Sequence, residues 1–419
     1  MNAYDTELIK TILKNADFTL SDSEMDADVV MLNTCSVRDN ANRKIFNRVH
    51  EIKRRGAVLV GVLGCMATNF RKKLLENPGL KIDFIAGPDS YKQLPSLISE
   101  AVETGEKTFH VKLSEFETYS DLYPTREGGV NAWIAVMRGC NNYCTFCVVP
   151  HTRGRERSRD PLNVIQEVRR LVSEGYKQVT LLGQNVNSYR YERYDFTDLI
   201  QMVSDVPGVE RIRFTSPHPK DFPRKLLTVM ASRKNICKQV HMPLQSGNTR
   251  ILEKMNRTYT KEEFLGLVDD ARSIVPDVAM STDVIVGFPS ETAEEFRDTI
   301  DVIQRVEFDY AFMFKYSERP NTLAAKRFPD DVSEEDKTTR IVELVALQRD
   351  IALKRNRMHI GNVEEILIEE EVNKRNPNES QGRNDGNTVV IIPRGEHKQG
   401  DLISVKITDA TVSVLKGVL

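Results

Sequence analysis

Cys140-Asn141-Asn142-Tyr143-Cys144-Thr145-Phe146-Cys147 places three cysteines within eight residues, in the spacing C-x3-C-x2-C. The whole chain of 419 residues holds only six cysteines, so this grouping departs strongly from an even scatter. Three thiolates can hold three irons of a [4Fe–4S] cluster and leave the fourth iron open to a small molecule. A structural metal site would close that position. The spacing therefore favours a catalytic cluster with the ligands Cys140, Cys144 and Cys147.

A zinc site is the alternative interpretation of the same stretch. His151 lies four residues after Cys147, so the segment could also close as a Cys3His zinc site. The surrounding sequence favours the cluster. An apolar run typical of a strand, 132–137, precedes the loop, and Gly139 provides a tight turn between them. Ligands on a loop just past a strand end suit an α/β barrel, whose active site lies at that face.

The charge and the length of the apolar runs limit the function classes. Lys and Arg number 59 and Asp and Glu 61, a formal net charge of -2, so any surface that binds nucleic acid must be local. No apolar run reaches the length of a membrane span, and the first residues lack the pattern of a signal peptide. Free thiols in metal-like spacing fit a reducing cytosol, so we expect a cytoplasmic protein.

Residues 1–105 alternate helix and strand patterns and predict a parallel-sheet α/β domain. Buried strands are expected at 28–32, 57–63 and 83–86, and Val37 begins the period-four face of a helix between the first two. A further helical face near the start comprises Leu8, Ile9, Ile12 and Leu13. The charged segment 106–130 contains Pro124 and a Gly-Gly pair, which predicts a linker.

Residues 131–356 repeat the alternation and predict an open, partial (β/α)6 barrel that ends in a long polar helix at about 333–356. The expected strands end near Met137, Leu182, Phe214, Met242, Ile285 and Phe314. The last segment, 357–419, changes to strand patterns separated by turns, which predicts a small β-barrel. The overall fold class is therefore α/β with a C-terminal all-β domain.

Polar segments follow four successive strands of the predicted barrel, at 182–187, 215–219, 241–247 and 283–291. Their glycines would let a nucleoside approach the backbone. Any one such loop is weak evidence, but four in succession behind the cysteine loop predict a ligand site. A basic run from Arg153 to Arg159 is either a solvated loop or a contact to a carboxylate or a phosphate.

Cys35 and Cys65 each follow a predicted strand. Cys35 is also expected to begin a helix, whose positive end favours a thiolate. Two ordinary buried cysteines are the alternative. Cys237 lies outside every motif, and we expect it to be structural.

The run from Gly139 through Cys147 to Arg159 resembles the radical S-adenosylmethionine (SAM) superfamily and, within it, the tRNA methylthiotransferases. The resemblance implies that SAM chelates the open iron of the cluster. It places Phe146 against the adenine, although core packing is an equal alternative, and it places Arg153 and Arg159 near SAM or the cluster. The strand-end residues expected near SAM are Gln184, Ser216, Gln245, Ser246 and Gly287.

The resemblance also implies a second, auxiliary [4Fe–4S] cluster that is held by three cysteines, two of them Cys35 and Cys65. In the family the third cysteine belongs to a motif Gly-Cys-Gln-Met-Asn, which the first residues Met1 and Asn2 continue. We therefore expect this ligand two residues before Met1, in a chain that is truncated or was assigned a late start.

The same resemblance makes 357–419 a TRAM domain, an OB-like RNA-binding module, although its acidic residues outnumber its basic ones. The predicted reaction converts N6-isopentenyladenosine beside the tRNA anticodon to its 2-methylthio derivative. One SAM would donate the methyl group and a second would supply the radical. The expected partners are tRNA and, as electron donor, a flavodoxin or ferredoxin. We expect a monomer that does not associate with a membrane. The alternatives are an enzyme for threonylcarbamoyladenosine, one for a ribosomal-protein aspartate, and a zinc-stabilised RNA-binding protein without catalysis.

Overall fold

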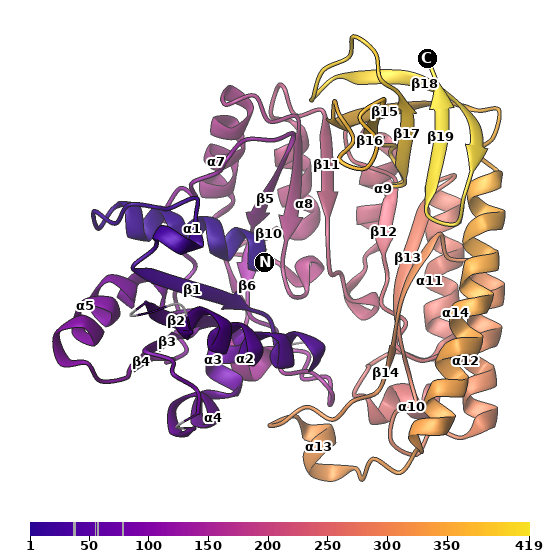
Figure 1. The fold of residues 1–419 in the computed structure, drawn as a ribbon. Helices are drawn as coiled ribbons and strands as arrows, with labels where there is room; N and C mark the ends of the chain where they lie inside the picture. Colours follow the sequence, from indigo (N-terminus) through magenta and orange to yellow (C-terminus); the bar gives the residue numbers. More distant parts are fainter. Residues whose placement is uncertain (37–38, 55, 57, 78) are drawn as a thin grey trace. The chain divides into compact units, whose positions relative to one another are not determined.

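Two units make up the chain in the computed structural model, which describes residues 1–36, 39–54, 56, 58–77 and 79–419 (Figure 1). Each unit is assembled from separate stretches of sequence. Unit 1 consists of Met1–Glu127, Met137–Arg159 and Ser317–Arg327, and unit 2 of Gly128–Val136, Asp160–Tyr316 and Phe328–Leu419. The cysteine loop therefore folds as part of unit 1.

Unit 1 is built on a four-stranded parallel sheet in the order β1 (Val29–Thr34), β2 (Leu59–Gly64), β3 (Phe84–Ala86) and β4 (Thr108–His110). β2 and β3 are apolar and buried, as strands covered on both faces require. The three predicted strands are confirmed. The segment 106–130, predicted as a linker, contributes β4 to the sheet and the fully buried Tyr119. Val37 and Ala57, predicted in a helix and a strand, lie outside the described residues.

The helices of unit 1 include α1, whose predicted apolar face is buried. The two residues of β6 (Met137–Arg138) pair with β7 (Arg157–Ser158) in an antiparallel ladder, so the two ends of the cysteine loop are held together. The helices are α1 (Asn2–Lys14), α2 (Asp39–Lys53), α3 (Cys65–Asn69), α4 (Arg71–Glu76), α5 (Leu94–Thr104), α6 (Val149–Arg153) and α13 (Leu323–Arg327).

Unit 2 carries the six predicted strands as two parallel three-stranded sheets, although the first ends at Ala135 and the predicted end, Met137, belongs to β6 of unit 1. One sheet has the order β11 (Arg211–Phe214), β8 (Gln178–Leu182), β5 (Asn131–Ala135). The other has the order β12 (Gln239–His241), β13 (Ala279–Val286), β14 (Tyr310–Lys315). An isolated bridge between Ile212 and Ile236 joins the run of strands from one sheet to the other, which gives the open, partial barrel expected.

Helices follow the barrel strands, and Figure 1 shows α12 and α14 running side by side next to β14. Every second residue of β13 is buried, which is the alternation of a strand with one covered face. A short hairpin, β9 (Arg190–Tyr191) and β10 (Tyr194–Asp195), follows β8. The helices are α7 (Pro161–Ser173), α8 (Phe196–Ser204), α9 (Arg224–Ser232), α10 (Thr249–Lys254), α11 (Lys261–Ile274), α12 (Ala293–Val306) and α14 (Glu334–Arg357).

The tail forms the predicted β-barrel, a closed ring of five strands around a core that includes Ile366, Val390 and Val405. Two of its strands, β16 and β19, were not predicted. In chain order the strands are β15 (Val363–Glu370), β16 (Glu379–Arg383), β17 (Val389–Pro393), β18 (Leu402–Ala410) and β19 (Val414–Val418). Among the described residues, no helix has the length and apolar character to cross a membrane.

Two buried arginines of β11 join this β-barrel to the strands of the partial barrel. Arg211 donates to the backbone carbonyl of Glu365 at 2.8 Å and to that of Arg383 at 2.5 Å. Arg213 donates to the carbonyls of Asn384 and Asp385 at 2.8 and 2.9 Å. Because buried charges are costly unless they are hydrogen-bonded, these contacts make the tail part of the fold of unit 2.

Candidate functional site: two cysteine clusters and the strand ends

The cysteine loop folds as one tight turn. Cys140 and Cys144 are buried and Cys147 is half-buried. The Cys140 N–H donates to the Gly154 carbonyl at 3.1 Å, and the Cys147 N–H donates to the Cys144 carbonyl at 2.9 Å. The Val149 N–H lies 3.5 Å from the Cys147 sulfur, the direction in which a backbone amide stabilises a thiolate.

Gly139 fixes the entrance to this turn. Its φ is +79°, and a Cβ atom there would lie 2.0 Å from the Arg155 carbonyl oxygen. Only glycine combines a left-handed backbone with so close an approach of two chain segments. The residue before the first cysteine is therefore dictated by the geometry of the loop.

The cysteine loop supplies the donor set of an iron–sulfur cluster with one open iron. His151, the residue that would close a Cys3His zinc site, is exposed. A [4Fe–4S] cluster with one open iron needs three thiols, each of which binds a different iron. Cys140, Cys144 and Cys147, on one ordered turn with an amide directed at a sulfur, fit that requirement.

Cys35 and Cys65 follow paired positions of adjacent strands. Thr34 of β1 is in register with Gly64 of β2, so the two cysteines leave the same edge of the sheet. Cys65 is buried and Cys35 is exposed. The expectation that Cys35 begins a helix is wrong, because Cys35 and Ser36 lie outside any helix; Cys65 is instead the first residue of α3. The described chain thus brings these two thiols to the same edge of the sheet.

A buried charge network lies beside Cys65. The Asp5 carboxylate accepts hydrogen bonds from Arg138 at 2.7 Å and from Arg153 at 2.6 Å, and the Arg153 Nε lies 3.3 Å from the Cys65 sulfur. Burial alone would raise the pKa of Asp5, but Arg153 and Arg138 outweigh it and hold this pKa below its usual value. Arg153, expected near SAM or its cluster, therefore contacts Cys65, which is expected to bind the auxiliary cluster.

Asp5 and Arg138 were missed by the sequence analysis. Asp5 lies in the first turn of α1, where an acidic residue is ordinarily explained by the helix dipole. Arg138 lies in β6, and its guanidinium stacks 4.6 Å from the centre of the Tyr119 ring. Their partners are more than a hundred residues away in sequence, so no local pattern could have paired them.

The strand-end residues predicted for SAM all lie in unit 2. Ser246 is fully buried, and its hydroxyl accepts from the Asn248 N–H at 3.3 Å. The Gly287 N–H donates to the Glu291 carboxylate at 2.6 Å. Burial raises the pKa of Glu291, against the opposing effects of this N–H and of Arg340. Gln184 follows β8, and Ser216 follows β11.

Ser216 and Gln245 have left-handed backbones, with φ of +60° and +67°. The Gln245 N–H and carbonyl pair with the carbonyl of Asp283 and the N–H of Ile285, at 2.8 and 2.9 Å, which holds its conformation. Such strain in residues other than glycine is concentrated at functional sites. Its occurrence at the ends of two barrel strands supports the prediction for these two residues.

The remaining predicted residues belong to unit 1. Phe146 is half-buried in the cysteine loop. Arg159 is buried and donates to the Tyr4 hydroxyl at 3.2 Å. The described contacts of Arg159 therefore tie it to α1.

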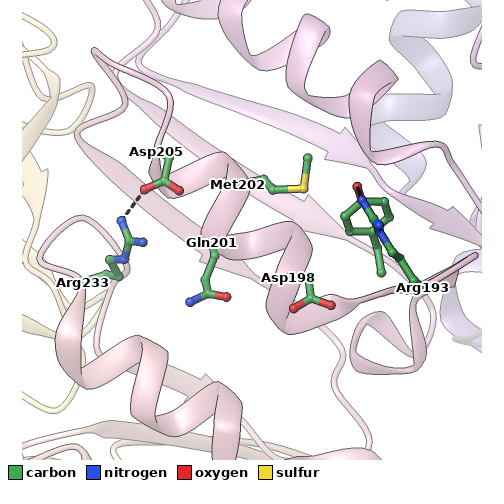
Figure 2. A pocket seen from close by; sticks show the side chains of 7 residues that line it. Arg193, Asp198, Gln201, Met202, Asp205 and Arg233 are labelled. Carbon is green, nitrogen blue, oxygen red and sulfur yellow. Dashed lines mark hydrogen bonds and ion pairs between the residues drawn. The ribbon is translucent and has the colours of Figure 1, made fainter.

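Figure 2 shows a shallow pocket in unit 2 that contains none of the predicted residues. It lies on the solvent face of α8, where Asp205 pairs with Arg233. The lining residues are Arg193, Tyr194, Asp198, Gln201, Met202, Asp205 and Arg233. Its acidic and basic side chains pair across the surface, and we assign it no part in the chemistry of the cysteines.

Three family models match the chain. They are the radical SAM superfamily over residues 134–303, the uncharacterized protein family UPF0004 over residues 1–87, and the TRAM domain over residues 357–419. The tRNA-2-methylthio-N(6)-dimethylallyladenosine synthase of Bacteroides fragilis is 46% identical over all of this chain and 93% of its own length. The chain belongs to this synthase family. The same enzyme of Chloroherpeton thalassium is also 46% identical and that of Porphyromonas gingivalis 44%, each over the whole chain and 93% and 92% of their lengths.

Solved structures agree with the fold of the synthase family. The radical SAM methyltransferase TsrM from Kitasatospora setae, with cobalamin and a [4Fe-4S] cluster bound, matches with a TM-score of 0.58. The match covers 77% of this chain and 71% of that one, at 16% identity, and so concerns the fold alone. As members of the radical SAM superfamily, synthases of this family use an iron–sulfur cluster together with SAM.

Proposed function

We propose that this chain is a radical SAM tRNA methylthiotransferase that converts N6-dimethylallyladenosine, also called N6-isopentenyladenosine, to its 2-methylthio derivative beside the anticodon. The observation that carries the proposal is the match to synthases of that name over the whole chain, together with the ordered C-x3-C-x2-C turn. When bound, the cluster would supply the electron that cleaves SAM to a radical able to take hydrogen from the adenine.

The residues of unit 1 would bind and shield the cluster. Cys140, Cys144 and Cys147 would each hold one iron, and the Val149 N–H would stabilise the Cys147 thiolate. Phe146, half-buried beside the last cysteine, would cover the adenine of SAM. Burial of two of the three thiols would limit the access of water and oxygen to the site.

The strand ends of unit 2 would orient SAM. We assign Gln184, Ser216, Gln245, Ser246 and Gly287 to this role. The left-handed backbones of Ser216 and Gln245, at the ends of two barrel strands, support this assignment.

Cys35 and Cys65 would be two of the three ligands of the auxiliary cluster, which would keep sulfur ready for transfer. Two roles would then fall to SAM, a methyl donor toward that sulfur and a radical source. We further propose that the protein acts in the cytoplasm as a monomer, and that a small flavodoxin or ferredoxin reduces it. All these assignments rest on the family. The assignment of Cys35 and Cys65 rests also on the paired strand ends that carry both thiols.

The TRAM β-barrel would bind the tRNA substrate. Arg394, Lys398 and Arg375 are exposed, whereas Arg383 is tied to Glu369 at 3.1 Å and to the Asn387 carbonyl. Deleting the tail would leave the buried Arg211 and Arg213 of β11 without their acceptors. Replacing Arg394 and Lys398 by alanine is the sharper test, and it should weaken tRNA binding and reduce its salt dependence.

Mass spectrometry of tRNA nucleosides tests the reaction. Cells that lack this protein should accumulate N6-isopentenyladenosine and lose its 2-methylthio derivative. Loss of 2-methylthio-threonylcarbamoyladenosine instead would overturn the assigned substrate. In the purified enzyme, Cys144→Ala should abolish formation of 5′-deoxyadenosine, because two thiolates do not hold the cluster. Cys65→Ala should keep SAM cleavage and lose methylthiolation; normal methylthiolation would show that Cys65 is only a core residue.

A further inference from the structure

Arg153 contacts the sulfur of Cys65 although it belongs to the segment of the other cluster. It is the last residue of α6, the helix that begins two residues after Cys147. Its Nε lies 3.3 Å from the Cys65 sulfur, and its Nη2 lies 2.6 Å from Asp5. One planar guanidinium therefore bridges a fixed carboxylate and a thiol, a geometry that a flexible ammonium group cannot reproduce.

The network carries more positive than negative charge. Arg138 and Arg153 share the single carboxylate of Asp5, and all three side chains are buried. The neighbouring Arg157 is balanced by its own partner, Asp89, at 2.9 Å. An excess buried charge is costly unless an anion compensates it. The sulfur that lies within reach of Arg153 is that of Cys65. An anionic group held by this cysteine would supply the compensating charge.

Some N–H groups of these two arginines are not used as hydrogen-bond donors. Within the described residues, Nη1 of Arg153 and both Nε and Nη1 of Arg138 are buried and have no hydrogen-bond partner. The guanidinium of Arg138 lies against the Tyr119 ring. Buried N–H groups without a partner are rare in folded proteins, so Nη1 of Arg153 points to a missing acceptor. Sulfur atoms of an iron–sulfur cluster accept such hydrogen bonds, and these bonds tune the reduction potential of the cluster.

We infer that Arg153, oriented by Asp5, is a positioning residue of the auxiliary site that holds the Cys65 thiolate and raises the reduction potential of the cluster bound there. The inference rests on the proposed function, because the auxiliary cluster is part of that function. Since α6 follows the SAM-cluster turn directly, the same side chain also fixes that turn to α3, which carries Cys65.

The test compares variants of the full-length holoenzyme in a Cys144→Ala background, which leaves the auxiliary cluster as the one observed. Arg153→Gln removes the charge. Arg153→Lys keeps the charge but not the planar guanidinium that bridges two partners. Arg155→Gln alters an exposed arginine two residues away and is the matched control. Iron content, the electron paramagnetic resonance spectrum and a redox titration are measured for each variant.

Arg153→Gln should lower the reduction potential and change the g-values, because a positive charge and its hydrogen bonds favour the reduced, more negative cluster. Arg153→Lys should recover part of the potential, and Arg155→Gln should match the parent. If Arg153→Gln does not fold, a parent-like spectrum and potential for Arg153→Lys would overturn the inference, and a changed spectrum would support it.

Two other outcomes separate the inference from the proposed function. An Arg153→Gln protein with a full auxiliary cluster and an unchanged potential would overturn the inference alone. A parent that binds no second cluster would overturn both the inference and the auxiliary part of the function. SAM cleavage by the enzyme with its native cysteines would then still support the radical SAM part.

Discussion

Replacing Gly139 by alanine should destroy the cysteine turn more severely than any loss of a single contact. Two costs add at this residue. An L-residue in a left-handed conformation costs about 1–2 kcal/mol. The new Cβ would also lie 2.0 Å from the Arg155 carbonyl oxygen and 2.7 Å from that of Gly154, both of them backbone atoms that cannot rotate away.

The steric clash of the new Cβ accounts for the larger part of the expected loss of unfolding free energy. Real Cβ contacts essentially never fall below 3.0 Å, so the 154–155 segment would have to move by about 1 Å. Overpacking of this kind typically costs 1–3 kcal/mol, so the total is about 2–5 kcal/mol. Gly154 accepts the N–H of Cys140, so this movement would displace the first ligand.

Gly175→Ala is the matched control. Its φ of +92° carries the same conformational cost, but nothing lies within 4 Å of the added Cβ. We expect Gly175→Ala to lose about 1 kcal/mol of unfolding free energy and to bind iron normally. Gly139→Ala should lose most of the SAM-cluster iron after anaerobic reconstitution, measured by iron and sulfide analysis. Equal iron content in the two variants would refute the argument from the clash.

Three further predictions concern other parts of the chain. Arg213→Ala leaves the carbonyls of Asn384 and Asp385 without their hydrogen-bond donor, and it should lower the unfolding free energy of unit 2 by about 3 kcal/mol. Urea titration measures this loss, and the control Arg349→Ala, at an exposed residue, should lose less than about 0.5 kcal/mol. Glu364 raises the pKa of His359 by a hydrogen bond, so this contribution to stability should be complete below the ordinary pKa of 6.5 and lost as pH rises through the raised value. The stability difference between the native protein and His359→Gln should accordingly shrink as pH rises from 6.5 through the raised pKa, and a constant difference would contradict the linkage. Gly287→Ala, whose Cβ would meet the buried Lys337 side chain at 2.3 Å, should weaken equilibrium binding of SAM, measured by calorimetry, without loss of iron.

Strong local signals explain what could be predicted from the sequence. The barrel strands β8, β13 and β14 are rich in β-branched or apolar residues, and the structure ends each of them at or next to the predicted residue. β16 was missed because its sequence, Glu-Ser-Gln-Gly-Arg, is polar and is a strand only through its neighbours in the closed barrel. β4 was missed because three residues carry too little pattern, and pairing with β3 determines it.

The candidate site likewise contains residues that a local pattern predicts and residues that no local pattern predicts. The spacing of Cys140, Cys144 and Cys147 is a local signal, and so is the glycine before them. The contact of Arg153 with Cys65 spans 88 residues and that of Arg138 with Asp5 spans 133. Contacts of this kind depend on which segments the fold brings together, and periodicity in one segment contains no information about them.

The division of the chain has a consequence for its synthesis on the ribosome. Unit 1 begins at Met1 but includes Ser317–Arg327, and the Ala324 N–H donates to the Thr145 carbonyl in the cysteine loop at 2.8 Å. The first unit to emerge therefore cannot be completed until most of the second has been translated. During that interval the cysteine turn lacks the hydrogen bond from Ala324, so its folded form depends on a segment that is translated long after the turn itself.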